Sequence, residues 1–190
     1  MKFTVNTADI EELNVIQDWS DAIKCREIRN IYYFTDEKAP NYAIKDAKVL
    51  EKMFEKYDSN LDKKEIIYRG IRFKKSDKEQ MIFFNLLKES FELVLNTSDT
   101  ISIDMAPASF TRVKKIAEDE FGLVNNKNFC TIIYKLVFRI SNEIEIEKGM
   151  NDFSYQKEVI IRSQKAEYKV LSIVPKEYDT MIVEITEEET

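Results

Sequence analysis

Residues 131–140 read Thr-Ile-Ile-Tyr-Lys-Leu-Val-Phe-Arg-Ile, and this stretch decides the fold class of the chain. Apolar residues occupy every second position from Ile132 to Ile140, and a period of two is typical of a β-strand. Shorter stretches elsewhere in the chain repeat the pattern. Further strands are therefore expected at residues 66–69, 144–147, 158–162, 168–174 and 181–185.

The first half of the chain has the period of a helix. Apolar residues recur at intervals of three and four over Ile10–Phe34, Asn41–Tyr57 and Asp77–Leu95, which predicts a helix in each range. A short helix is expected within Thr111–Phe121. Because helices come first and strands follow, we expect an α+β fold with a helical N-terminal segment over about residues 1–60. The first and third helices are expected to bury Val15, Ile16, Trp19, Ala22 and Ile23, and Phe83, Leu86, Leu87, Phe91 and Val94.

Length and composition indicate one folded domain over residues 1–190. The chain is 44% hydrophobic and 34% charged, as is ordinary for a globular protein. Residues 1–9 lack the basic start and apolar run of a secretory signal, and no apolar stretch approaches the roughly 20 residues that cross a bilayer. We therefore expect a cytoplasmic protein with no membrane partner.

The residue types that are missing restrict the chemistry. The chain has no His, which excludes Ser-His and Cys-His nucleophile pairs and the usual zinc hydrolase sites. Cys25 and Cys130 are too isolated for a zinc site, so no metal is expected. The glycines Gly70, Gly122 and Gly149 supply neither a Rossmann fingerprint nor a P-loop. Any reaction must use carboxylates, hydroxyls, amides and cations.

The net charge of the chain argues against nonspecific nucleic-acid binding, but it allows a local anion-binding site. The formal net charge is -6, and nonspecific nucleic-acid binding needs Lys and Arg to neutralise phosphates. Residues 62–78, however, contain seven Lys or Arg and three Asp or Glu. Within them Ile66–Gly70 is expected to form an apolar strand ending in Arg69, whose guanidinium can bond a phosphate at two points. Gly70 would let a flat ligand approach the backbone. The alternative is a strand-end Arg in a surface ion pair.

Two further segments carry polar side chains that suit chemistry. Ser109-Phe110-Thr111 is expected at a strand end before a helix, where the Ser109 hydroxyl can orient a carboxylate or an amide, or simply cap the helix. In Phe153–Ile161 a polar loop enters an apolar strand, and Gln156 and Glu158 would share one face of an extended chain. The carboxylate of Glu158 can stabilise an oxocarbenium-like transition state. The alternative is an exposed polar strand edge.

Together these segments resemble the Arg-Ser-Glu class of ADP-ribosyltransferases. Tyr68-Arg69-Gly70, Ser109-Phe110-Thr111 and Gln156-Lys157-Glu158 fill the three motifs of that class in order, most closely as in the phage-encoded Mod enzymes and, for the last motif, the clostridial Rho-modifying exoenzymes. The resemblance covers about residues 66–185. It implies a mainly antiparallel split β-sandwich core over about residues 61–190 that binds NAD as substrate.

The resemblance also implies roles for single residues. Arg69 would bind the NAD diphosphate, and the Gly70 backbone would meet the nicotinamide carboxamide. Ser109 would hold the nicotinamide end and position Glu158, the catalytic carboxylate that bonds the ribose 2'-hydroxyl. Gln156, with Phe153, would bind the acceptor.

Two departures from the class restrict what the resemblance implies. Thr111 stands in a Ser-Phe-Thr element where Ser-Thr-Ser is usual, and Gln156 replaces the Glu of arginine-modifying relatives, which disfavours arginine as acceptor. The implied function is a mono-ADP-ribosylating toxin or phage effector. Its partners would be a protein or nucleic-acid acceptor and an antitoxin or immunity protein. An NAD glycohydrolase and a noncatalytic binding or immunity module are the alternatives.

Overall fold

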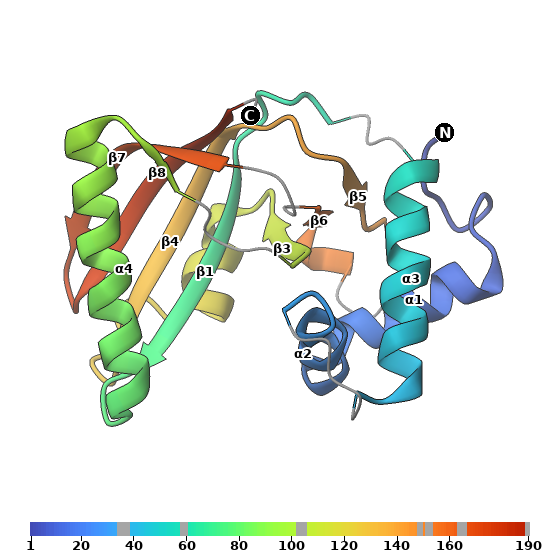
Figure 1. Ribbon diagram of the computed structural model, residues 1–190, viewed down its shortest axis with the longest axis horizontal. Coiled ribbons are helices and arrows are strands. Elements are labelled where there is room, and N and C mark those ends of the chain that lie inside the picture. The colour runs from blue at the N-terminus through green and yellow to red at the C-terminus, as the bar shows by residue number, and fades with distance from the viewer. Residues whose placement is uncertain are drawn as a thin grey trace. The chain divides into compact units, whose positions relative to one another are not determined.

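A computed structural model describes residues 1–33, 39–57, 61–101, 106–147, 150, 154–162 and 167–188. The chain forms two compact units (Figure 1). The helical unit comprises Met1–Leu61, Asp104–Ser109 and Ser141–Lys165, and the sheet unit comprises Asp62–Ile103, Phe110–Ile140 and Ala166–Thr190. Whether the two units act as the single domain expected from the sequence stays a prediction.

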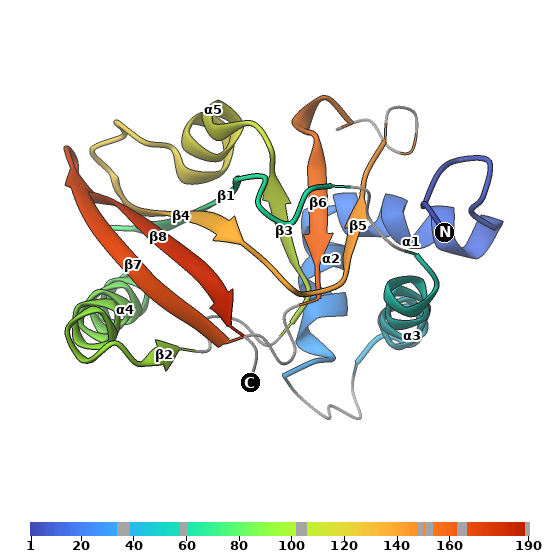
Figure 2. The ribbon, with the colours of Figure 1, turned by 90° about the horizontal axis from the view of Figure 1, so that it is seen from above.

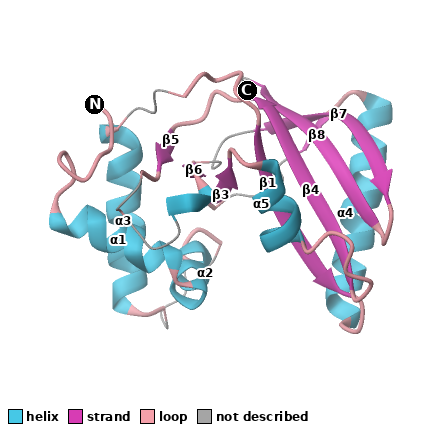
Figure 3. Cartoon of the chain, turned by 180° about the vertical axis from the view of Figure 1, so that it is seen from behind, coloured by secondary structure: helices cyan, strands magenta, loops and turns pink. Residues whose placement is uncertain are grey.

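The helical unit packs three helices around a hydrophobic core. Its helices are α1 (Ile10–Ser20), α2 (Ala22–Asn30) and α3 (Asn41–Lys56). The antiparallel pair β5 (Glu143–Glu145) and β6 (Glu158–Ile161) completes it, with a 3-10 turn at Ser154–Gln156 (Figure 3). The core contains Phe3, Val15, Ile16, Trp19, Ile28, Ala43, Ala47, Leu50, Met53, Phe54, Tyr57, Ile144, Ile146, Met150 and Ile160.

The single helix expected over residues 10–34 is wrong in one respect, because two helices occupy this range. Asp21 ends α1 in an extended conformation, and its side chain accepts hydrogen bonds from the backbone N–H groups of Ile23 and Lys24 at the start of α2. The change of direction leaves Ile23 61% exposed, although its spacing had placed it on the buried stripe. A local N-cap therefore overrides a continuous helical period.

The sheet unit contains the long strands. It holds β1 (Ile67–Lys74), α4 (Lys78–Thr97), β2 (Thr100–Ile101), α5 (Lys114–Ile116), the π-helix η1 (Ala117–Gly122), β4 (Phe129–Phe138), β7 (Glu167–Lys176) and β8 (Thr180–Glu188). The strand order is β2-β7-β8-β4-β1-β3 (Figure 2). Here β3 (Ala108–Thr111) starts in the helical unit and ends in this one. β4 pairs with β8 in parallel, and β1 pairs antiparallel with β3 and β4. The expected α+β fold is confirmed.

Helix α4 packs on this sheet through a face that matches the expected one only in part. Phe84 lies 5.4 Å from Phe73 of β1 between ring centroids, and Phe91 lies 5.9 Å from Tyr134 of β4. Phe91 and Val94 are buried as predicted, whereas Phe83 and Leu86 are 56% and 55% exposed. α4 carries apolar residues on two faces, so periodicity alone does not select the face that is buried. Among the described helices none is long and apolar enough to cross a membrane.

Candidate functional site

Glu158 is the centre of the candidate site. It is the first residue of β6, in the helical unit, and is 8% exposed. Burial raises the pKa of this carboxyl, because a charged group loses hydration, and hydrogen bonds from Ser109 and Trp19 oppose the rise. The burial of Glu158 contradicts the alternative of an exposed polar strand edge at this position.

Trp19 and Ser109 bring two further parts of the helical unit to this carboxylate. The indole Nε1–H of Trp19 donates to Ser109 Oγ at 2.9 Å and to Glu158 Oε1 at 3.2 Å. Ser109 lies in β3, and its hydroxyl also bonds Glu158. Ser109 thus contacts the carboxylate that it is expected to orient, and the orienting role itself stays a prediction. Sequence reasoning placed Trp19 only in the core and missed its polar end, although buried indoles usually have a hydrogen-bond partner.

Gln156 is held differently from the expectation. It ends the 3-10 turn, is 8% exposed, and its Nε2 donates to the Tyr155 hydroxyl at 3.3 Å. Lys157 has φ 47, in the left-handed region, so Gln156 and Glu158 do not follow each other in one extended strand. The same-face argument from strand alternation is therefore wrong, because the backbone turns between the two residues. Phe153 lies outside the described residues.

Arg69 and Gly70 belong to the sheet unit. Both lie in β1, where Arg69 is half-buried and opposes Tyr134 of β4, with its guanidinium carbon 6.0 Å from the centroid of the Phe110 ring. That distance is at the limit of a cation–π contact. A side chain on Gly70 would meet the backbone, since an ideal Cβ there lies 2.2 Å from the carbonyl oxygen of Ala117. The close packing of η1 against β1 is therefore enough to require a glycine at position 70, without any ligand.

Part of the positive charge around Arg69 is committed to structure. Lys75 Nζ lies 2.5 Å from Asp179 Oδ2 in a salt bridge, and Arg72 donates to the Glu120 carbonyl at 3.2 Å. The seven cations of residues 62–78 thus do not form one free anion site. Phosphate binding by Arg69 stays a prediction, and it no longer draws support from the charge of the whole segment.

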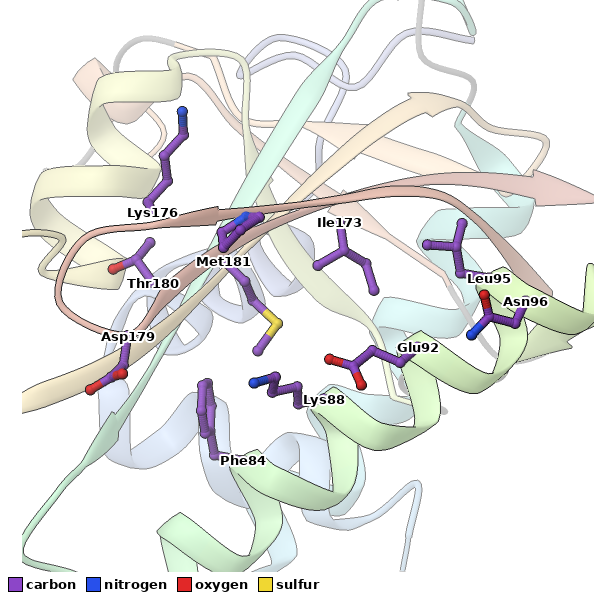
Figure 4. Close-up of a pocket in the computed structure, with 11 residues that line it drawn as sticks. Phe84, Lys88, Glu92, Leu95, Asn96, Ile173, Lys176, Asp179, Thr180 and Met181 are labelled. Carbon is purple, nitrogen blue, oxygen red and sulfur yellow. The ribbon is translucent and has the colours of Figure 1, made fainter.

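A cavity of about 560 Å³ lies elsewhere in the sheet unit, between α4 and the β7–β8 hairpin (Figure 4). Lys88 and Glu92 of α4 and Met181 of β8 point into it in this view. Neither Arg69 nor Gly70 lines this cavity. Among the described residues no group of three metal-ligating side chains occurs.

Solved structures show which fold this is. No protein-family model matches the chain, and no curated protein matches it in sequence. The C3 exoenzyme of Clostridium limosum superposes with TM-score 0.64 at 15% identity, covering 96% of this chain and 87% of that one. The Vis toxin, an ADP-ribosyltransferase from Vibrio splendidus, gives TM-score 0.62 at 14% identity over 97% and 76% of the two chains. The fold is that of the ADP-ribosyltransferases. C3stau2 from S. aureus, solved with NAD, has it too, with TM-score 0.60 at 13% identity over 97% of this chain and 89% of that chain.

Proposed function

We propose that this protein is a mono-ADP-ribosyltransferase that transfers ADP-ribose from NAD to a macromolecule, with Glu158 as its catalytic carboxylate. The observation that carries the proposal is the cluster of Glu158, Ser109 and Trp19, in which a carboxylate buried to 8% exposure keeps two neutral hydrogen-bonding partners. A buried, oriented carboxylate in this fold suits the stabilisation of a developing cation.

The reaction needs little more than positioning and charge. As the bond between nicotinamide and ribose breaks, positive charge develops on the ribose, and an ionised Glu158 that accepts a hydrogen bond from the 2'-hydroxyl stabilises it. Ser109 holds that carboxylate by the hydrogen bond described above. Arg69 has the planar guanidinium suited to a diphosphate, and the Gly70 backbone would meet the carboxamide. Nicotinamide leaves with the bonding electrons, and the acceptor nucleophile attacks the ribose carbon.

In this proposal Gln156 recognises the group that accepts ADP-ribose. Its amide both donates and accepts hydrogen bonds and, in contrast to a carboxylate, offers no charge to a guanidinium acceptor. Vis has been solved with agmatine, a guanidinium compound. For the present chain the Gln disfavours arginine and leaves a non-arginine side chain or a nucleic-acid base as acceptor. We place its action in the cytoplasm, as a toxin or phage effector controlled by an antitoxin or immunity protein.

The test uses labelled NAD with a cell lysate, followed by separate protease and nuclease digestion. Label that protease alone releases identifies a protein acceptor, and label that nuclease alone releases identifies a nucleic acid. Release of nicotinamide without transfer of label to either class would identify an NAD glycohydrolase. If purified protein neither consumes NAD nor transfers label, the proposed activity is refuted and a noncatalytic module remains.

A further inference from the structure

One indole N–H in the helical unit serves two acceptors. Trp19 Nε1 lies 2.9 Å from Ser109 Oγ and 3.2 Å from Glu158 Oε1, and both distances are within hydrogen-bond range. An indole has a single N–H donor and no acceptor. The shared donor therefore links α1, β3 and β6 at the carboxylate.

A purely structural indole would not need this arrangement. A buried N–H group destabilises the folded protein only if it lacks a hydrogen-bond acceptor. Ser109 Oγ already supplies an acceptor, at the shorter of the two distances. The additional approach to Glu158 Oε1 satisfies no need of the indole itself. It does benefit the carboxylate, because a donor to an ionised oxygen makes a stronger bond than a donor to a neutral one.

The ring of Trp19 is fixed well enough to act as a rigid donor. Trp19 is 3% exposed and packs in the same core as Val15 and Ile16, both on α1. The start of α1 is fixed by a capping box between Asp9 and Glu12. Glu12 in turn accepts a hydrogen bond from the Tyr57 hydroxyl at 2.6 Å. The position of the indole N–H is thus set by the helix and its core.

We infer that Trp19 is a positioning residue, which holds the Glu158 carboxylate ionised and oriented through its indole N–H. The N-terminal helical segment thereby supplies part of the candidate site, a role that its sequence pattern did not indicate. The consequence for catalysis rests on the proposed function. The coupling between Trp19 and Glu158 does not, and is measurable without NAD.

Charged neighbours do not explain the state of Glu158. The groups that act on its carboxyl among the described residues are Ser109 from β3 and Trp19 from α1, both neutral. On the elements packed against it, Asp18 of α1 pairs with Lys24 at 2.6 Å, and Glu145 of β5 lies 3.8 Å from Lys2. Glu143, also on β5, opposes Ile161 at the far end of β6.

The first experiment uses the fluorescence of Trp19, which is the only tryptophan of the chain. We expect the emission to show a titration step whose midpoint lies above the ordinary glutamate range, and this step to vanish in Glu158→Gln. Glu145→Gln is the matched control, since it removes a carboxylate from the neighbouring strand, and should keep the step. An unchanged step in Glu158→Gln, or no step in the wild type, would overturn the coupling.

The second experiment removes the N–H and keeps the shape of the ring. Biosynthetic replacement of the single tryptophan by benzothienylalanine substitutes sulfur for the indole N–H and should leave the core packed. We expect kcat for nicotinamide release to fall about 10- to 100-fold, as for loss of a hydrogen bond to a charged group, with KM little changed. The acidic limb of the pH profile should move to higher pH. An unchanged kcat and pH profile in folded protein would overturn the positioning role.

Failure of this inference is distinguishable from failure of the proposed function. If wild-type protein does not consume NAD, the proposed function fails, while the fluorescence titration still decides whether Trp19 senses Glu158. If wild-type protein consumes NAD and the benzothienyl protein matches it, only the role of Trp19 fails. Trp19→Phe provides a second variant that lacks the donor, and circular dichroism checks that it folds.

Discussion

Gly70→Ala tests why β1 carries a glycine beside Arg69. An ideal Cβ at this position would lie 2.2 Å from the Ala117 carbonyl oxygen and 2.7 Å from the Gly122 nitrogen, whereas ordinary contacts begin at 3.4 Å. Both atoms are backbone, so rotation of a side chain cannot relieve the overlap. Either β1 or η1 must move by about 1 Å.

Neither segment is free to move. Every residue of β1 pairs with β4 across the register Ile67↔Leu136 to Lys74↔Phe129. η1 is tied to β4 by the Thr131 hydroxyl, which donates to the Gly122 carbonyl at 2.6 Å. Overpacking of a core typically costs about 1–3 kcal/mol when side chains can adjust. For a clash between backbones we expect the upper end or above, about 3–4 kcal/mol, and a fall in Tm of roughly 10 °C for a chain of this size.

Urea denaturation followed by far-UV circular dichroism measures the loss. Gly122→Ala is the matched control, because its new Cβ meets two flexible side-chain ends, Ile133 Cδ1 and Thr131 Cγ2, each at 2.8 Å, besides the Ala117 oxygen at 2.9 Å. It should lose less stability than Gly70→Ala. A Gly70→Ala protein as stable as wild type would refute the packing argument. If that protein had lost NAD binding, the glycine would serve ligand approach.

Three further predictions concern the proposed reaction and a fourth concerns stability. Glu158→Gln should lower nicotinamide release and transfer at least about 100-fold in a folded protein, and retained turnover would remove Glu158 from the mechanism. Arg69→Lys should mainly weaken NAD binding in calorimetry, since an ammonium cannot make a planar two-point contact; equal affinities would make Arg69 structural. Gln156→Ala should abolish label transfer while residual NAD hydrolysis continues, and transfer at the wild-type rate would end the argument against arginine. Asp46→Asn should stabilise the helical unit at pH 7 and reduce the pH dependence of its unfolding, as followed by Trp19 fluorescence.

Elements with a strong local signal could be predicted from the sequence. Residues 131–140 alternate so regularly that β4 was placed within a few residues of its observed bounds, Phe129–Phe138. The helix expected at Asn41–Tyr57 is observed as Asn41–Lys56. Chemistry and the resemblance to a known motif select Ser109 and Glu158, and in the structure both accept the indole N–H of Trp19.

What could not be predicted depends on contacts between distant segments. Trp19 and Glu158 are 139 residues apart, and spacing within α1 shows only that Trp19 is buried. The face that α4 buries is selected by Phe73 and Tyr134 on the sheet. The turn at Lys157 was missed because a positive φ at a lysine has no compositional signal, whereas glycine would have marked it.

The stability prediction for Asp46 follows from a pair of carboxyls in the helical unit. Asp46 of α3 is 8% exposed, and its Oδ2 has no hydrogen-bond partner among the described residues. Burial raises the pKa of Asp46 to about 6, and the charge and hydrogen bond of Asp18 add to the rise, while Lys45 and Lys24 lower it.

Because the folded pKa exceeds the unfolded one, the protonated form is stabilised by folding. The contribution of protonated Asp46 to the stability of the folded protein is fully present below about pH 4 and is lost as the pH rises through about 6. At pH 7 the wild type therefore folds with an unfavourable buried charge, worth at most about 3 kcal/mol. An Asn amide removes that charge and can donate to Asp18 as the carboxyl proton does. Asp46→Asn should accordingly gain about 1–3 kcal/mol at pH 7 and little at pH 4. A loss of stability at pH 7, or an unchanged slope between pH 4 and 6, would refute the assignment of this charge pair.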